Sequence, residues 1–175
     1  MKFASNAEVS RRNFLSQTLT LASSTLVASA LLPPAFAHAS APSQEKLPPL
    51  KLELVKEFVT AGHNNLDRVK EMLANEPGLL NATWDWKAGD FETALGGAGH
   101  MGRKDIANYL LEQGARMDIF VAAMLGKLEI VKAMLAAFPN ALHSKGPHGI
   151  TLLKHAQAGK EDAAAVAEYL SGLLG

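Results

Sequence analysis

The sequence predicts an all-α fold built from four stacked helix–turn–helix units. An apolar residue, followed by further apolar residues three and four positions later, recurs at residues 69–73, 107–111, 131–135 and 166–170. This spacing makes one face of a helix. Five residues before the first three copies stand Asn64, Gly102 and Gly126, and Gly159 precedes the fourth copy at a slightly longer distance. These residues favour tight turns, so each copy is predicted to be the second helix of a unit.

The first 37 residues have the order of a secretory signal, with basic residues before an apolar stretch and small residues at its end. The segment Ser-Arg-Arg-Asn-Phe-Leu closely resembles the twin-arginine export signal. The residues that carry this resemblance are Arg11, Arg12, Phe14 and Leu15. The resemblance implies export of the folded protein across the bacterial inner membrane, and therefore a periplasmic location.

The signal is predicted to end at Ala37, with Ala39 and Ala41 as alternative cleavage points after small residues. The apolar stretch at 19–32 is shorter than a membrane-spanning helix and is closed by two prolines, so we expect no membrane association after cleavage. Residues 38–50 are proline-rich and polar, which predicts a linker. The predicted organisation is a signal peptide at 1–37, a linker at 38–50 and a repeat domain at 51–175.

The repeat domain resembles the ankyrin family. Residues 93–102 read Thr-Ala-Leu-Gly-Gly-Ala-Gly-His-Met-Gly, which is similar to the ankyrin signature Thr-Pro-Leu-His-x-Ala-Ala-x-x-Gly. Thr93 is placed to cap a helix through its hydroxyl group, while Ala98 and Gly99 are small enough for a neighbouring helix to pack closely. The resemblance implies a short ankyrin-repeat solenoid whose general role is recognition of other proteins.

The four units differ in the segments that join them. The second unit has a long insertion, for which we expect at most a short β-hairpin near residues 83–91. In the third unit, residues 118–121 run directly into the first helix, so no hairpin is expected there. Any binding surface made from a continuous row of hairpins would be interrupted at this point.

Composition excludes several function classes. The chain has no cysteine, which excludes disulfides, thiolate metal sites and cysteine nucleophiles. Beyond residue 37 the net charge is about −2, which gives no reason to expect nucleic acid as a partner. Ser144 beside His143 lacks a recognisable nucleophile setting, so no enzyme activity is predicted.

The histidines are the main argument for a metal. His143, His148 and His155 invite this hypothesis, but they do not have the spacing of a helical ligand pair, and the sequence alone predicts no metal or other cofactor. His63 and His100 each fall just before the turn of a first helix, a position that in ankyrin proteins usually faces the concave side. They are interpreted as surface histidines, with partner contact as the alternative.

Aromatic residues suggest a partner surface. Trp84 and Trp86, the two tryptophans of the chain, would project from one face of an extended hairpin. They either fold back over the core or form a binding patch, since tryptophan is enriched among interface hot spots. The predicted partner-binding residues are Trp84, Trp86, Phe91, His100 and Met101.

The function predicted from the sequence is a non-enzymatic protein-binding module, monomeric, acting on an unidentified protein in the bacterial periplasm. The alternative is an exported metal-binding protein or an accessory subunit of a periplasmic enzyme. Twin-arginine export favours this alternative because the route carries folded cargo, often with a cofactor already inserted. A further alternative is a companion that matures or protects one exported enzyme.

Overall fold

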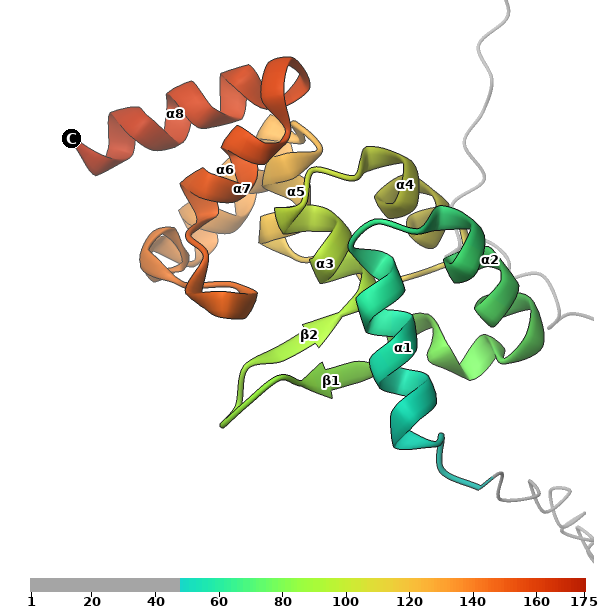
Figure 1. Ribbon diagram of the computed structural model, residues 1–175. Helices are drawn as coiled ribbons and strands as arrows, with labels where there is room; N and C mark the ends of the chain where they lie inside the picture. The colour runs from blue at the N-terminus through green and yellow to red at the C-terminus, as the bar shows by residue number, and fades with distance from the viewer. Residues whose placement is uncertain (1–47) are drawn as a thin grey trace, which may run out of the picture. The chain divides into compact units, whose positions relative to one another are not determined.

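The computed structural model describes residues 48–175, which form four consecutive pairs of α-helices (Figure 1). The pairs are α1 (Leu52–Gly62) with α2 (Leu66–Asn75), α3 (Ala94–His100) with α4 (Lys104–Glu112), α5 (Ile119–Met124) with α6 (Leu128–Ala137), and α7 (Leu152–Ala158) with α8 (Ala164–Leu174). The expected all-α class is confirmed for this part of the chain. The predicted signal segment and most of the linker lie outside the described residues.

Short elements join the helix pairs. The 3₁₀ helices are η1 (Pro77–Asn81), η2 (Pro139–His143), η3 (Pro147–Gly149) and η4 (Lys160–Ala163). Strands β1 (Thr83–Asp85) and β2 (Phe91–Thr93) form the expected hairpin, and they are antiparallel with Trp84 opposite Glu92. No strand separates α4 from α5 in the described structure, as the sequence predicts.

Helix starts and turns follow from local chemistry. The Thr93 hydroxyl accepts a hydrogen bond from the backbone N–H of Gly96 at 3.0 Å and caps α3, as predicted. Asp118 caps α5 in the same way through the N–H of Val121. Gly102 has φ of 67°, which a residue with a side chain adopts only with strain, so glycine permits the tight turn from α3 to α4.

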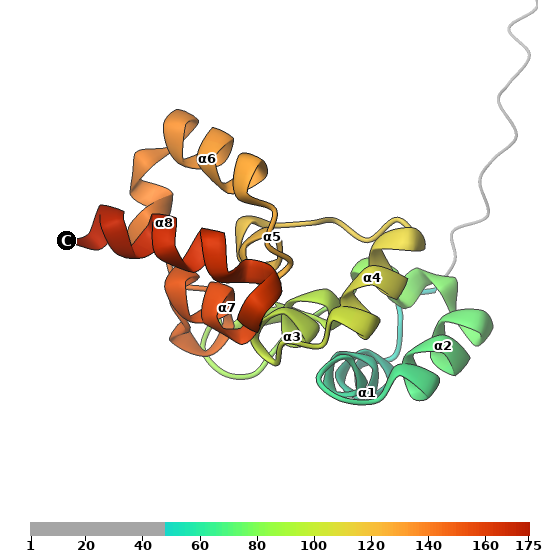
Figure 2. The ribbon, with the colours of Figure 1, turned by 90° about the horizontal axis from the view of Figure 1, so that it is seen from above.

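The first helices of successive pairs pack side by side in the order α1, α3, α5, α7, while each second helix packs on its own partner (Figure 2). Small residues make this close approach possible. A Cβ atom added to Gly62 would lie 2.4 Å from the carbonyl oxygen of Ala94, so α1 and α3 can touch only because residue 62 is glycine. The C-terminal end of α1 is therefore held against the first turn of α3.

Two clusters of buried apolar side chains stabilise the fold. The first contains side chains from the helices α1, α2, α3 and α4, and it includes Phe58 and Leu110, both fully buried. The second contains side chains from the helices α5, α6, α7 and α8, and it includes Leu152 and Leu170. Helix α5 contributes to both clusters. No helix among residues 48–175 is long and apolar enough to cross a membrane.

Candidate metal centre

A buried carboxylate lies at the centre of a cluster of histidines. Glu92 is the middle residue of β2, and its side chain is fully buried on the face of the strand that it shares with Trp84. A buried carboxylate destabilises a protein unless it is paired and hydrogen-bonded. Here four side-chain nitrogen atoms approach its two oxygen atoms. They belong to Trp86, His63, His100 and His148.

The two carboxylate oxygen atoms divide these contacts. His100 Nε2 lies 2.9 Å from Oε1. Trp86 donates its indole N–H to Oε2 at 2.6 Å, and the Nε2 atoms of His63 and His148 lie 3.3 and 3.4 Å from the same oxygen. One nitrogen from each of the three histidines and one Glu92 oxygen all lie within 4.8 Å of one another.

Helix packing brings the first two histidines together. His63 directly follows α1 and His100 is the last residue of α3. The close packing of these two helices brings the two rings together, with centroids 4.9 Å apart. Gly97 leaves the room this arrangement needs. A Cβ atom there would lie 2.8 Å from Nδ1 of His63, closer than real side chains come.

The third histidine comes from a distant segment. His148 lies in η3, the 3₁₀ helix that precedes α7, and its ring centroid is 5.2 Å from that of His100. Asp90, the residue directly before β2, holds His148 through two contacts. One carboxylate oxygen accepts the backbone N–H of His148 at 2.8 Å, and the other lies 3.0 Å from Nδ1.

The contacts of His63 and His148 on the side away from Glu92 determine which ring nitrogen carries a proton. Nδ1 of His63 lies 3.0 Å from the carbonyl oxygen of Val59, and Nδ1 of His148 lies against the Asp90 carboxylate. Both neighbours accept hydrogen bonds, so each Nδ1 must be the donor. In neutral histidines the Nε2 lone pairs would then face the oxygen atoms of Glu92. Such a contact is stable only with a cation between the groups, either a proton on each Nε2 or a metal ion.

The electrostatics agree with this geometry. Burial alone raises the pKa of Glu92, but hydrogen bonds from His100, His63 and Trp86 outweigh burial and lower that pKa to about 2. The hydrogen bond to Glu92 raises the pKa of His63 despite burial of its ring. Without a metal, a proton on His63 therefore helps to balance the carboxylate charge. Metal binding would replace that proton.

The predicted partner-binding residues fall into two environments. Phe91 and Met101 are 62% and 52% exposed, whereas Trp84 and Trp86 are partly buried against the first core cluster. His100 has a side chain only 7% exposed and belongs to the cluster around Glu92, so its interpretation as a surface histidine is wrong. The structure does not bring the five residues together as one exposed patch.

The histidines singled out for a metal are also separated. His148 belongs to the cluster, whereas His143 is exposed in η2. His155 is buried beside the cluster but outside it, and its ring centroid is 6.4 Å from that of His100. Burial lowers the pKa of His155. Its Nδ1 contacts the carbonyl oxygen of Thr151 at 2.9 Å, and its Nε2 is the one buried side-chain nitrogen or oxygen atom without a partner in the described residues.

Sequence reasoning missed Glu92 entirely, because an isolated acidic residue in a short strand carries no recognisable motif. It also separated His63 and His100 from the metal hypothesis. One signal was available for that pair. Both residues precede the turn of a first helix, and equivalent positions in neighbouring repeats become neighbours in space.

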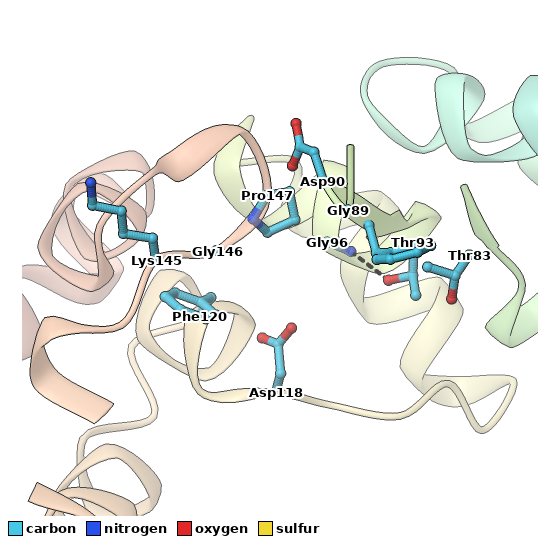
Figure 3. Close-up of a pocket in the computed structure, with 11 residues that line it drawn as sticks. Thr83, Gly89, Asp90, Thr93, Gly96, Asp118, Phe120, Lys145, Gly146 and Pro147 are labelled. Atoms are coloured by element: carbon cyan, nitrogen blue, oxygen red, sulfur yellow. Dashed lines mark hydrogen bonds between the residues drawn. The ribbon is translucent and has the colours of Figure 1, made fainter. Parts of the chain in front are cut away.

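A separate pocket of about 320 Å³ lies on the other face of β2 (Figure 3). Phe91 and Thr93 line it, and because side chains alternate along a strand, Glu92 between them points away from it. Figure 3 shows the Asp118 carboxylate extending into the space between Phe120 and Thr93. Asp90 lines the pocket and also contacts His148, so it connects the pocket to the histidine cluster.

Comparison of the chain with models of known protein families gave no match, and comparison with curated proteins also gave none. The candidate site therefore rests on its own geometry and chemistry.

Proposed function

We propose that this chain is a metal-binding protein that holds one divalent transition-metal ion through His63, Glu92, His100 and His148. One observation carries this proposal: three imidazole Nε2 atoms converge on one buried carboxylate. In two of the three histidines, the other ring nitrogen already faces a hydrogen-bond acceptor. This is the arrangement by which proteins orient metal-binding histidines.

The donor set favours particular metals. Three imidazole nitrogens and one carboxylate oxygen suit Zn²⁺, Co²⁺, Ni²⁺, Cu²⁺ and Fe²⁺. Mg²⁺ and Ca²⁺ prefer oxygen ligands, which this site supplies only from Glu92. Cu⁺ prefers sulfur ligands, and none of the four residues of the site supplies sulfur. Zinc is the first ion to test, because its four-ligand sites accept nitrogen and oxygen donors in this proportion.

The scaffold we propose is a short ankyrin-type stack. Four helix pairs, the Thr93 cap and the glycine turn at Gly102 support the resemblance to that family. We further propose export by the twin-arginine route on the strength of Arg11 and Arg12. Export of a folded protein fits metal insertion before translocation, since the ligands come from segments that meet only after folding.

Protein recognition is a second candidate function. Phe91 and Met101 are large apolar side chains exposed on β2 and at the end of α3, next to Glu92 and His100 in the sequence. Exposed apolar side chains favour a partner contact. In this interpretation the metal centre would set the shape of a surface that recognises another protein, without enzyme activity.

The test is metal content. Protein purified from its native host should contain close to one equivalent of a transition metal, and metal-depleted protein should bind one equivalent of Zn²⁺ in calorimetric titration. His100→Ala should abolish this binding. His143→Ala should not, because His143 is exposed and lies outside the cluster. Absence of stoichiometric metal from the purified protein, together with no Zn²⁺ binding in titration, would exclude the proposal.

A further inference from the structure

We infer that His148 is an exchangeable ligand of the proposed metal, whereas His63, Glu92 and His100 are fixed ligands. Its departure would open a coordination position for a small anion from solvent. This inference rests on the proposed metal site. Three observations distinguish His148 from the other ligands: where it comes from, the conformation of its backbone and its exposure.

The fixed ligands belong to one packed unit. His63 directly follows α1, while Glu92 and His100 lie on β2 and α3, and α1 and α3 contribute side chains to the first core cluster. His148 comes from the loop before α7, a helix that packs in the second cluster. Movement of this loop can therefore withdraw one ligand while the other three stay in place.

The backbone of His148 is in an unfavourable conformation. Its φ is 58° and its ψ 18°, in the left-handed region that residues with a side chain rarely adopt. Two contacts from Asp90 hold it there. The bound position of His148 is thus maintained against a local preference, and a movement of the loop that changes this backbone conformation would relieve the strain.

Exposure increases from the base of the site to its rim. The side chains of Glu92, His100, His63 and His148 are 0%, 7%, 18% and 34% exposed, respectively. An incoming ligand from solvent therefore meets His148 first. The rim of the site is made by His148 and His63, and its floor by Glu92.

The charge of the site selects the ligand class. A divalent ion with one carboxylate and neutral imidazoles carries a net charge of about +1, which attracts small anions. With His148 released, three protein ligands and one exchangeable position remain, which is the composition of catalytic rather than structural zinc sites. We expect the position to accept water, hydroxide or a small monovalent anion such as azide.

The experiment uses the full chain loaded with Co²⁺, whose visible absorption bands report coordination. Wild type, His148→Ala and His100→Ala are compared, first for Co²⁺ binding and then for the response to azide. His148→Ala should still bind one Co²⁺ per chain, with affinity reduced by at most about 100-fold, the size of effect produced by loss of an outer-shell partner. His100→Ala should lose Co²⁺ altogether.

Azide should change the spectrum of both proteins that bind Co²⁺. The azide concentration that produces this change should be at least about tenfold lower for His148→Ala than for the wild type. In the variant the coordination position is always open, whereas in the wild type only the molecules with His148 released can bind azide, which lowers the apparent affinity. The inference is overturned if azide leaves both spectra unchanged or acts equally on both. It is also overturned if His148→Ala loses Co²⁺ as completely as His100→Ala. Failure of the wild type to bind Co²⁺ or Zn²⁺ would instead overturn the metal site itself.

Discussion

Asp90 holds His148 through two contacts that span 58 residues of the chain, one to the backbone N–H and one to the ring Nδ1. The pair connects the β-hairpin to the loop before α7. The backbone N–H of His148 lowers the pKa of Asp90, with its ring contributing in the same direction, so the carboxylate stays charged over the neutral range. Asp90 is thereby a positioning residue for the proposed metal ligand.

Asp90→Asn should weaken metal binding by about 10- to 100-fold, but by no more than His148→Ala, because the amide cannot accept hydrogen bonds at both contacts. Calorimetric titration with Zn²⁺ measures the change. Asp85→Asn is the matched control, since Asp85 lies in the same hairpin but accepts its hydrogen bonds from Gly89. Equal effects of the two substitutions would mean that Asp90 only supports the hairpin.

Glu92→Gln should abolish metal binding and change how the stability of the metal-free protein depends on pH. The folded pKa of Glu92 is about 2, below its ordinary value of 4.5, so its charge adds stability above pH 4.5 that is lost as pH falls toward 2. The contribution is about 3 kcal/mol by the size of this shift. The raised pKa of His63 makes stability depend on pH in the opposite direction. Its protonated ring adds stability below pH 6.5, and this stability is lost as pH rises through the pKa of His63 in the folded protein.

The difference in unfolding free energy between wild type and Glu92→Gln should therefore be largest between about pH 4.5 and 6.5 and decrease on both sides. Chemical denaturation of both metal-free proteins across this range measures it. Other carboxylates titrate in both proteins, so the comparison isolates Glu92. A difference that does not vary with pH would contradict the charged pairing of Glu92 with His63.

Trp86→Phe should lower the free energy of unfolding by about 1.5–3 kcal/mol, the value of a hydrogen bond to a charged group. The substitution keeps an aromatic ring but removes the N–H that Glu92 accepts at 2.6 Å. Trp84→Phe is the control, because Trp84 packs against the same core and its ring lies near Lys56 rather than donating to Glu92. We expect a smaller loss for Trp84→Phe, and the reverse order would contradict the assigned hydrogen bond.

Leu110→Ala should destabilise the protein by roughly 2–5 kcal/mol, because this fully buried leucine lies in the first core cluster on α4. Leu52→Ala serves as the comparison, since Leu52 begins α1 and is exposed. Thermal unfolding measures both variants. A Leu110→Ala protein that melts at the wild-type temperature would show that the helix does not pack in this register.

Replacement of Arg11 and Arg12 together by lysine should leave the protein in the cytoplasm with its signal unprocessed and its fold intact. Cell fractionation with detection of the two sizes of the chain measures the outcome. Metal content of the retained protein adds a second readout, because a site loaded before export should be occupied there as well. Normal periplasmic accumulation of the double variant would exclude the twin-arginine assignment.

The sequence by itself predicted the helices, one helix cap and one tight turn of residues 51–175, but not the four 3₁₀ helices. Apolar spacing predicted the helices, the Thr93 hydroxyl predicted a cap and Gly102 predicted a turn, because each of these depends on residues within a few positions of one another. The hairpin near residues 83–91 was also predicted, from the length of the insertion.

Only the tertiary structure decided the site. His63, Glu92, His100 and His148 have no common spacing. They meet because the end of α1 packs against α3, β2 turns Glu92 inward and a later loop returns to the hairpin. Burial then gives Glu92 its importance. An exposed carboxylate would be satisfied by water, whereas a buried one needs the converging nitrogen atoms, and that requirement arises only when the distant segments have packed.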